Sequence, residues 1–366
     1  FAYMPIEKRL ERIKKVIQTE VKRKTTAVLN TLNAKYEQSI GRALDGIRDA
    51  EKRRLLVTKY IDERDERIPK IKQEVKSTAT AYMRKFDKVK IKPMYRELLT
   101  NRILLSELAA EWSFEEIEQF LAAHQKESWV LEDLAALYYL HARIKGIPDK
   151  WKMRVVFIDE VQDYSLFQLA ALKAGLETDM FTMVGDLAQG IHSYRSLTEW
   201  DSVLKLFPRA TYATLQKSYR TTIEIMEVAN KILSKMDEDL PLVEPVVRHG
   251  KDPTFIRCEA FNADTILKTY NAIKSNGHRS IALIAKTTAE AKTIVSRLVE
   301  ARMPVSLLDE SATLDQSKLL VVPSHLAKGL EFDAVIIAAF DTPFYDHPID
   351  RKLLYVALTR AMHELY

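Results

Sequence analysis

Cysteine and long apolar runs are the clearest absences in this sequence. Cys258 is the only cysteine among the 366 residues, which excludes disulfide bonds within the chain. A lone thiol suits a reducing compartment, so we expect a cytoplasmic protein in which Cys258 is a small buried side chain. No stretch approaches the roughly 18 consecutive apolar residues of a membrane-spanning helix, so we expect no membrane partner. The length allows two or three domains.

A phosphate-binding loop is also missing. Such loops follow the pattern GxxxxGK[ST], because their backbone amides, lysine and hydroxyl group surround nucleotide phosphates. The nearest stretch, RHGKDP at 248–253, lacks the first glycine and the hydroxyl residue. These 366 residues therefore do not contain all the parts of a nucleotide site.

Glycine is scarce in the first 150 residues, where the glycines are Gly41, Gly46 and Gly146. Apolar residues recur there at helical spacing, at Leu10, Ile13, Ile17, Val21, Val28 and Leu32. The stripe is narrow and charges fill the other faces, which predicts antiparallel helical hairpins, coiled-coil-like to about residue 105. Pro69 and Pro93 are expected to break these helices. The richer apolar content of 106–142 predicts helices that pack on a neighbouring domain.

Charge is distributed unevenly along the chain. Residues 1–110 carry 27 Lys/Arg against 15 Asp/Glu, a balance of +12, whereas 111–366 carry 29 against 36, a balance of −7. A basic helical arm suggests a polyanionic or acidic partner. A solvated helical surface is the alternative interpretation.

The pattern changes at Trp151, after which short apolar runs alternate with amphipathic stretches. Strands are predicted at 155–158, 180–184, 211–215, 280–285, 319–322 and 334–340. Helices are predicted from Leu166 to about Ala174 with a stop at Gly175, at about 222–235, and up to about residue 302. This alternation indicates α/β domains with parallel sheets. The polar, proline-rich stretch 240–253 is the expected boundary between domains 151–240 and 241–366.

The stretch VVFIDEVQDYS, residues 155–165, places two carboxylates directly after the first predicted strand, which we expect to be buried. Asp159 and Glu160 would lie at the carboxyl end of that strand, where open α/β sheets bind their ligands. Ser165 and Gln168 fit a capping box for the following helix. Ordinary loop polarity is the alternative interpretation of a single acidic pair.

Four further motifs follow in order: MVGDLAQGIHSYR (183–195), LQKSYRTT (215–222), PSHLAKGLEFD (323–333) and LLYVALTRA (353–361). With DEVQD, they resemble the later motifs of superfamily 1 helicases of the UvrD/Rep type. The resemblance covers residues 151–366 and implies RecA-like (P-loop NTPase) motor domains with parallel sheets, preceded by a long all-α insertion. GDLAQGIHSYRS, SYRTT and the helical insertion most resemble the HelD group, helicase-like ATPases that bind bacterial RNA polymerase.

The resemblance implies a site that hydrolyses ATP with Mg²⁺. Asp159 corresponds to the metal ligand, acting through water, and Glu160 to the base that orients the attacking water. Hydrolysis also needs cations beside the charge that develops on the γ-phosphate. Arg220 corresponds to a γ-phosphate contact and Arg360 to the arginine finger, while Gln189 corresponds to the glutamine that senses that phosphate.

Three more residues correspond to nucleotide contacts. Tyr219 would stack on the adenine, Glu331 would bind the ribose hydroxyl, and Gly329 would let the backbone approach the ligand. Arg220 directly precedes a helix that we expect Thr221 to cap, and a helix N-terminus favours anions. Taken alone, an arginine such as Arg220 or Arg360 would more often form a surface ion pair, and a tyrosine would more often pack in the core.

The nucleic-acid contacts of the family correspond to His192, Tyr194, Arg195 and His325. Conventional members have Tyr and Trp where His192 and Tyr194 stand, so stacking worth ~1–3 kcal/mol per base is weakened at His192. Pro323 replaces a threonine that helps to hold a backbone phosphate, and proline offers neither a hydroxyl nor an N–H. Ser324 could substitute, although it lies one position away.

Two functions are therefore expected for the parent protein. One is an ATP-driven protein that binds the RNA polymerase core through its helical arm and releases nucleic acid. The other is a conventional ATP-dependent DNA helicase or translocase of the UvrD/helicase IV type. The altered nucleic-acid contacts and the long insertion favour the first. Because the chain starts at Phe1 with no phosphate loop, we expect a fragment that is inactive alone, and a purely structural polymerase-binding role stays open for it.

Overall fold

Two compact units make up the protein in the computed structural model. The structure describes residues 4–86, 89–124, 128–191, 197–236, 240–246, 248–258, 260–308 and 318–366. The first unit is Phe1–Arg154 with Ala171–Thr178, and the second is Val155–Ala170 with Asp179–Tyr366. The first unit is helical and the second is α/β with parallel sheets. Within the described ranges, no helix is both long and apolar enough to cross a membrane.

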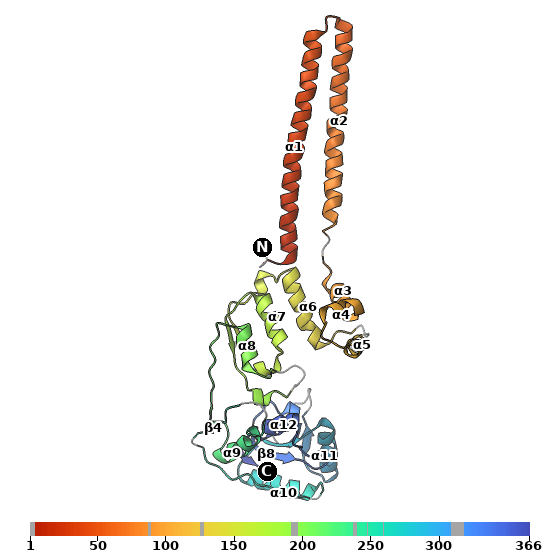
Figure 1. The fold of residues 1–366 in the computed structure, drawn as a ribbon. Coiled ribbons are helices and arrows are strands. Elements are labelled where there is room, and N and C mark those ends of the chain that lie inside the picture. Colours follow the sequence, from red (N-terminus) through yellow and green to blue (C-terminus); the bar gives the residue numbers. More distant parts are fainter. Residues whose placement is uncertain are drawn as a thin grey trace. The chain divides into compact units, whose positions relative to one another are not determined.

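A long helical hairpin begins the first unit (Figure 1). Helices α1 (Ile6–Gly46) and α2 (Ala50–Arg84) run antiparallel. At the turn between them, the Asp49 carboxylate accepts hydrogen bonds from the backbone amides of Glu51 (2.9 Å) and Lys52 (3.1 Å). Because the first amides of a helix lack partners within the helix, Asp49 fixes the start of α2.

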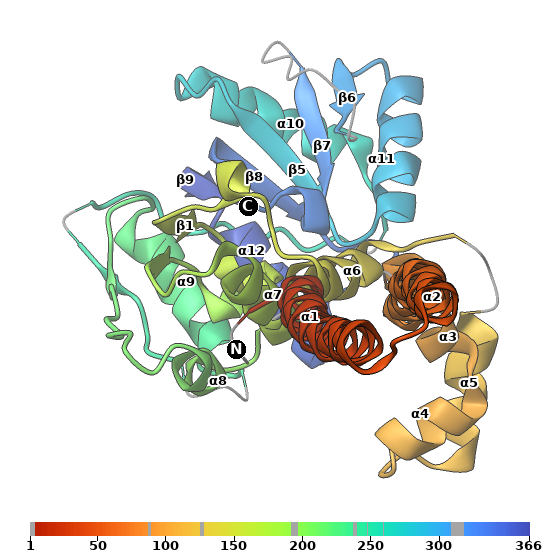
Figure 2. The ribbon, with the colours of Figure 1, turned by 90° about the horizontal axis from the view of Figure 1, so that it is seen from above.

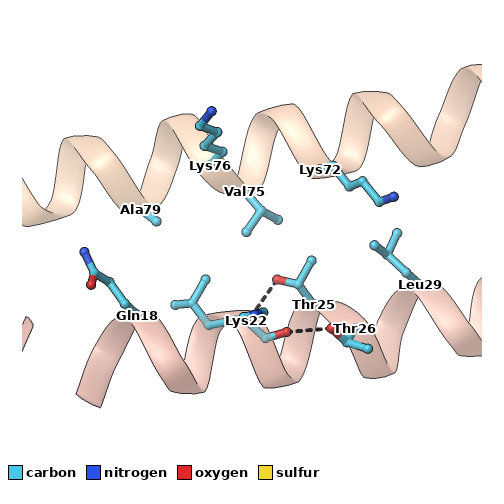
Figure 3. Close-up of a pocket in the computed structure, with 10 residues that line it drawn as sticks. Gln18, Lys22, Thr25, Thr26, Leu29, Lys72, Val75, Lys76 and Ala79 are labelled. Atoms are coloured by element: carbon cyan, nitrogen blue, oxygen red, sulfur yellow. Dashed lines mark hydrogen bonds between the residues drawn. The ribbon is translucent and has the colours of Figure 1, made fainter. Parts of the chain in front are cut away.

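The contact between the two hairpin helices is thin. α1 buries only Tyr36 and Ala43 among its residues, and α2 buries none. A cavity of about 400 Å³ opens between the helices. Thr25 and Leu29 point from α1 toward α2, and Val75 points back toward α1 (Figure 3). The apolar stripe is thus wide enough for one helix–helix contact and no thicker core.

Pro69 does not break a helix, contrary to the sequence prediction, because it lies inside α2. Proline lacks an N–H and clashes with the carbonyl four residues earlier, here that of Asp65. Both residues are exposed, so water can solvate the carbonyl that loses its partner. Pro93 lies in the first turn of α3, which follows the break after α2, and proline is tolerated there.

Shorter helices complete the first unit: α3 (Ile91–Thr100), α4 (Arg102–Leu108), α5 (Phe114–Ala123), α6 (Leu131–Ile144) and the 3₁₀ turn η1 (Asp149–Trp151). The Tyr95 hydroxyl of α3 donates to Asp133 Oδ1 of α6 at 2.9 Å. The Tyr95 ring stacks on Trp129 with 5.8 Å between ring centroids. The buried polar contact therefore holds α3 against α6, and the aromatic pair joins α3 to the residues just before α6.

Helix α7 (Leu166–Leu176) begins with the predicted capping box. The Ser165 amide donates to Gln168 Oε1 at 2.7 Å, and the Gln168 amide donates to Ser165 Oγ at 3.1 Å. The predicted stop at Gly175 is wrong, because the helix continues through it. A Cβ at Gly175 would lie 2.3 Å from the Tyr138 hydroxyl, so this glycine permits close packing.

Strands β1 (Val156–Ile158) and β2 (Phe181–Met183) form a two-stranded parallel sheet in the second unit. The prediction that the first strand is buried is wrong. Ile158 is buried, but Phe157 is 76% exposed and Val155 is 45% exposed. Within the described residues, β2 is the only strand that pairs with β1, so most of its apolar side chains have no cover.

The predicted strand at 211–215 does not form. Strand β3 lies just beyond it (Lys217–Ser218) and pairs in parallel with β4 (Glu244–Pro245). Residues 211–216 instead line a cavity of about 840 Å³, and Leu215 is 92% exposed. An apolar run pairs as a strand only where a neighbouring strand offers its backbone.

A five-stranded parallel sheet carries the main core (Figure 2). Its order is β6 (Val305–Leu307), β7 (Leu319–Pro323), β5 (Ile281–Ala285), β8 (Phe332–Ala338) and β9 (Ala361–Leu365). Helices α10 (Ala263–Ser275) and α11 (Thr288–Glu300) pack on one face, and α9 (Ile223–Leu233) and α12 (Pro348–Leu358) pack on the other. Alternate residues of β5 enter the two cores, which confirms the predicted parallel α/β sheet.

Two smaller expectations in this unit are corrected. Thr222 rather than Thr221 caps α9, with its hydroxyl 3.4 Å from the Ile225 amide. Cys258 is half-buried rather than buried. The remaining helix, α8 (Trp200–Leu206), follows β2 in the chain. The expected division between domains at residue 240 stays a prediction.

Candidate functional site

The two predicted carboxylates follow β1 in a tight turn. Glu160 has a left-handed backbone, with φ +51°, and leads into the 3₁₀ turn η2 (Val161–Asp163). Asp159 Oδ1 accepts the Glu160 amide at 2.8 Å. Left-handed backbone is uncommon for residues with a Cβ, so the turn is held by its contacts. Asp159 is exposed and Glu160 is half-buried at the carboxyl end of the strand.

Lys328, from the loop before β8, pairs with this acidic turn. Its Nζ lies 2.7 and 2.8 Å from the two Asp163 carboxylate oxygens and 3.6 Å from Glu160 Oε2. The Lys328 side chain is only 10% exposed, so the ion pair is poorly screened by water. The pair joins the β1 turn to a loop of the five-stranded sheet.

Gln162 is wholly buried beneath Glu160. Its Nε2 donates to Glu160 Oε2, and its Oε1 accepts the Asp186 amide at 3.0 Å. Gly185 makes this possible, because a Cβ there would lie 2.3 Å from Gln162 Oε1. Both ends of the buried amide are thus hydrogen-bonded, as burial of a polar group requires.

Asp186 caps the 3₁₀ turn η3 (Leu187–Gln189) after β2. One carboxylate oxygen accepts the Ala188 amide at 2.9 Å, and the other accepts Gln189 Nε2 at 2.8 Å. Burial raises the pKa of Asp186, and the hydrogen bonds from Gln189 and Ala188 oppose that rise. The Gln189 side chain therefore has a fixed orientation.

Arg360 lies between α12 and β9 and is 1% exposed. Its Nε donates to the Val356 carbonyl at 3.1 Å, and its Nη1 donates to the Leu330 carbonyl at 3.3 Å. Its Nη2 donates to Gln189 Oε1 at 3.0 Å and to Thr359 Oγ1 at 3.1 Å. The contact with Gln189 brings the predicted arginine finger and the predicted sensor glutamine together.

Arg220 lies close enough to Arg360 to influence its pKa. Burial lowers the pKa of Arg360, the charge of Arg220 lowers it further, and the carboxylates of Glu160 and Glu331 oppose the change. Arg220 Nε lies 2.8 Å from Glu331 Oε1 in a half-exposed ion pair. The structure thus gathers both predicted arginines, the predicted base and the predicted ribose contact in one electrostatic neighbourhood.

The other predicted nucleotide contacts are accessible. Tyr219 is 66% exposed, and Gly329 has φ +77° with open space where a Cβ would be. His325 is exposed in the 3₁₀ turn η4 (Ser324–Leu326). The remaining predicted nucleic-acid contacts lie outside the described residues: His192, Tyr194 and Arg195.

Ser324 does not substitute for the threonine that Pro323 replaces. The Ser324 side chain is buried, and its Oγ donates to the Ala285 carbonyl at 2.9 Å. A hydroxyl held in this way is not available to a nucleic-acid phosphate. Pro323 is itself buried as the last residue of β7.

Three residues of this site were not singled out from the sequence: Gln162, Asp186 and Lys328. Each lies inside a motif that was, within DEVQD, MVGD and AKGLEF respectively. The sequence feature that could have identified them is a polar residue within a few positions of a predicted ligand contact. Its partner could not be identified, because each contact joins residues far apart in sequence.

The residues present fit the γ-phosphate half of an ATP site. The half-exposed Arg220 can bind a phosphate. Glu160, in the turn after β1, can orient a water, and the exposed Asp159 can bind a hydrated Mg²⁺. Among the described residues, no cluster of three or more His, Cys, Asp or Glu could hold a metal by itself.

Comparison with known proteins shows similarity to helicases in part of the chain. Residues 318–366, which contain Lys328, Glu331 and Arg360, match the family described as UvrD-like helicase C-terminal domain. The chain is helicase-like. It is 24% identical over 185 residues to the ATP-dependent DNA helicase PcrA of Leuconostoc citreum and 22% identical over 188 residues to PcrA of Staphylococcus aureus. It is 27% identical over 237 residues to a probable DNA helicase of Mycoplasma pneumoniae.

The helicase-like chain spans only part of these relatives. The matches cover 46%, 48% and 58% of the chain, but 24%, 25% and 42% of the respective relatives. Among solved structures, the chain is similar to the C-terminal domain of a possible DNA helicase from Lactobacillus plantarum WCFS1. That match has 28% identity and a TM-score of 0.33, and it covers 40% of the chain and 85% of the other protein.

Proposed function

We propose that this chain is part of the motor of an ATP-dependent DNA helicase or translocase of the UvrD type. The observation that carries the proposal is the 3.0 Å contact between Arg360 and Gln189. Arg360 lies in the segment that matches the helicase family, and Gln189 follows the strand beside the acidic turn. The names of the relatives, PcrA and probable DNA helicase, support DNA as the polymer on which the motor acts.

The proposed motor domains are RecA-like, and each site residue has a role in ATP hydrolysis. Glu160 orients the attacking water, and Asp159 holds Mg²⁺ through water. Arg220 and Arg360 offset the negative charge that develops on the γ-phosphate. Bound ATP with Mg²⁺ supplies the phosphoanhydride bond whose hydrolysis drives the motor.

Three further residues would hold the rest of the nucleotide. Tyr219 presents an exposed ring for the adenine. Glu331 would bind the ribose hydroxyl, and Gly329 leaves room for the nucleotide to approach the backbone. Since Glu331 is paired with Arg220, nucleotide binding would exchange that ion pair for contacts to ribose and phosphate.

The proposal assigns activity to a longer protein that supplies a phosphate loop. The 366 residues contain no GxxxxGK[ST], so we expect them to hydrolyse no ATP alone. The test is Mg²⁺-dependent ATP hydrolysis by the longer protein and by its Glu160→Gln variant. The variant should lose most turnover but still bind ATP, because the base acts on water rather than on nucleotide affinity. Turnover at the parental rate would remove Glu160 from this role.

A second candidate function is release of nucleic acid from RNA polymerase, as in the HelD group. The helical hairpin favours it, because a thin, basic two-helix structure suits insertion into a channel. α1 alone has 41 residues, which at 1.5 Å per residue gives a length of about 60 Å. The balance of +12 over residues 1–110 would suit an acidic or polyanionic partner.

A deletion separates the two candidates. Removal of residues 6–84 from the longer protein takes away the hairpin and leaves every proposed ATP-site residue in place. If the protein is a DNA helicase, ATP-driven strand displacement should survive the deletion. If it acts on RNA polymerase, the deletion should abolish polymerase retention in a pull-down and leave ATP hydrolysis measurable.

A further inference from the structure

We propose that Gln162 is a positioning residue that couples Glu160 to Arg360 through a series of hydrogen bonds that passes through the side chain and the backbone amide of Asp186. Its catalytic consequence rests on the proposed ATPase function. The hydrogen-bond chain itself is a property of these 366 residues, so it can be tested separately.

The chain has four links. Arg360 Nη2 donates to Gln189 Oε1 at 3.0 Å, and Gln189 Nε2 donates to Asp186 Oδ2 at 2.8 Å. The Asp186 amide donates to Gln162 Oε1 at 3.0 Å, and Gln162 Nε2 donates to Glu160 Oε2. In each glutamine one end of the amide accepts and the other donates. The orientations of the two side-chain amides are therefore fixed by their neighbours.

Close packing makes Gln162 a stiff link. Its side chain is fully buried, and its Oε1 lies against the backbone of Gly185, where a Cβ would approach to 2.3 Å. A glutamate carboxylate at this position could not donate to Glu160. An apolar side chain could neither donate to Glu160 nor accept the Asp186 amide. Gln162 therefore cannot follow a movement of Glu160 without disturbing the Asp186 amide.

A movement of Arg360 would be transmitted through these hydrogen bonds to Glu160. The Arg360 guanidinium makes four hydrogen bonds to protein acceptors and the residue is 1% exposed, so it reaches a phosphate by giving up bonds such as that to Gln189. Loss of that bond frees Gln189, and the change passes through Asp186 and Gln162 to Glu160. Lys328 Nζ lies 3.6 Å from the same Glu160 oxygen. It is the competing partner that pairs with Glu160 when the hydrogen bond from Gln162 is lost. The base is thereby oriented according to the position of the arginine.

Two variants of the 366-residue protein dissect the chain. Gln162→Met removes both links, whereas Gln162→Glu keeps an acceptor for the Asp186 amide and removes the donor to Glu160. The matched control is Gln168→Glu, because a glutamate at 168 still accepts the Ser165 amide in the capping box of α7. The readouts are hydrogen exchange of the Asp186 amide and the NMR signal of the Arg360 guanidinium.

Gln162→Met should speed exchange of the Asp186 amide about tenfold and shift the Arg360 signal. Gln162→Glu should leave the Asp186 amide protected but shift the Arg360 signal, because the carboxylates of residues 162 and 160 repel each other. Gln168→Glu should change neither. An Arg360 signal unchanged in both Gln162 variants would overturn the proposed coupling, and Gln162→Glu alone decides the question if the Met variant does not fold.

The catalytic consequence is measured in the longer protein. Gln162→Glu should lower kcat for ATP hydrolysis about 10–100-fold, as for other groups that orient a catalytic residue, with KM for ATP little changed. Gln168→Glu should leave both constants unchanged. If the longer protein hydrolyses no ATP, the proposed function fails while the exchange and NMR results stand. If it hydrolyses ATP and Gln162→Glu leaves kcat unchanged, the coupling to catalysis is wrong.

Discussion

Arg360 combines a structural role with its proposed catalytic one. It donates to two backbone carbonyls, those of Val356 and Leu330. Arg360→Lys should therefore lower the free energy of unfolding by about 1–3 kcal/mol, because a lysine cannot reproduce the planar fork. Arg297→Lys, on the exposed side of α11, should have little effect in the same urea titration. Equal midpoints for the two variants would contradict the structural role.

The proposed catalytic role of Arg360 predicts a second, larger effect of its substitution. In the longer protein, Arg360→Ala should reduce ATP turnover by about 10³–10⁵, the usual contribution of an arginine finger. Steady-state hydrolysis at saturating ATP measures this loss. A variant that binds ATP and loses less than tenfold would show that Arg360 serves stability alone.

Lys328 should contribute to stability through Asp163. Lys328→Met leaves two carboxylates without their cation, and we expect a loss of about 1–3 kcal/mol. Asp163→Asn in the same background should cost less than it does in the parent, because the partners interact directly. The exposed pair Lys59–Glu63 supplies the control, since Lys59→Met should barely move the unfolding midpoint. Strictly additive losses for Lys328 and Asp163 would contradict the ion pair.

Contacts between residues close in sequence could be predicted, whereas contacts between residues far apart could not. Ser165 and Gln168 were correctly paired because a capping box spans three residues. Gly175 was misread as a helix stop because its real constraint, Tyr138, lies 37 positions earlier. The link from Gln162 to Asp186 was missed for the same reason. The catalytic roles were assigned to residues from the sequence motifs, and these assignments stay predictions.

At the scale of elements, α2 carries an avoidable strain at Pro69. Pro69→Ala should stabilise the hairpin by about 1–3 kcal/mol, because it restores the helix hydrogen bond and removes the clash with the preceding turn. Thermal unfolding followed by helical circular dichroism measures the gain. Pro93→Ala is the matched control, because Pro93 lies in the first turn of α3, where no helix hydrogen bond is lost. An unchanged or lower unfolding temperature for Pro69→Ala would contradict this account of α2.

Strand β9 contains a buried carboxylate with a pH-dependent contribution. The polar neighbours of Glu364 are Asn276, Lys251, Tyr366 and His278. Burial alone would raise the pKa of Glu364, but hydrogen bonds from Lys251, Tyr366 and Asn276 outweigh it, and the pKa is lowered. A carboxylate with a lowered pKa stabilises the fold above its unfolded value, near 4.5, and loses this contribution as the pH falls.

Glu364→Gln should therefore be less stable than the parent at pH 7, by about 1–3 kcal/mol. The difference should shrink below about pH 4, as the parent carboxylate becomes protonated. Urea titrations at a series of pH values test this, with Glu300→Gln at the exposed end of α11 as the control. A difference that is constant from pH 3 to pH 7 would contradict the assigned ionisation.

Strands were predictable where burial was complete. The run at 280–285 forms the central strand β5, whose two faces both enter cores, so an unbroken apolar sequence was a sufficient signal. The run at 211–215 forms no strand, and no strand pairs with it among the described residues. No local sequence pattern reveals a missing partner. For β1, the sequence correctly placed the strand, yet its exposure depends on what covers Phe157.

For the whole molecule, the helical part and the α/β part can be predicted from residue composition and from the spacing of apolar residues. Scarce glycine and a narrow stripe predicted long helices before Trp151, and alternating runs predicted parallel sheets after it. The turn at Asp49 was missed because a single capping residue between two charged helices gives a weak signal. The function of the whole protein is a separate question, because the chain spans 24% of the length of one PcrA relative.

Strand displacement by the longer protein is the most direct test of the proposed helicase function. A tailed DNA duplex is mixed with the protein, Mg²⁺ and ATP in the absence of RNA polymerase, and release of the shorter strand is followed. We predict ATP-dependent displacement that is lost in Glu160→Gln, with a slow rate because we expect His192 and Pro323 to weaken the DNA contacts. Robust ATP hydrolysis with no displacement, together with RNA polymerase retained in a pull-down, would contradict the DNA helicase function and favour the polymerase-binding alternative.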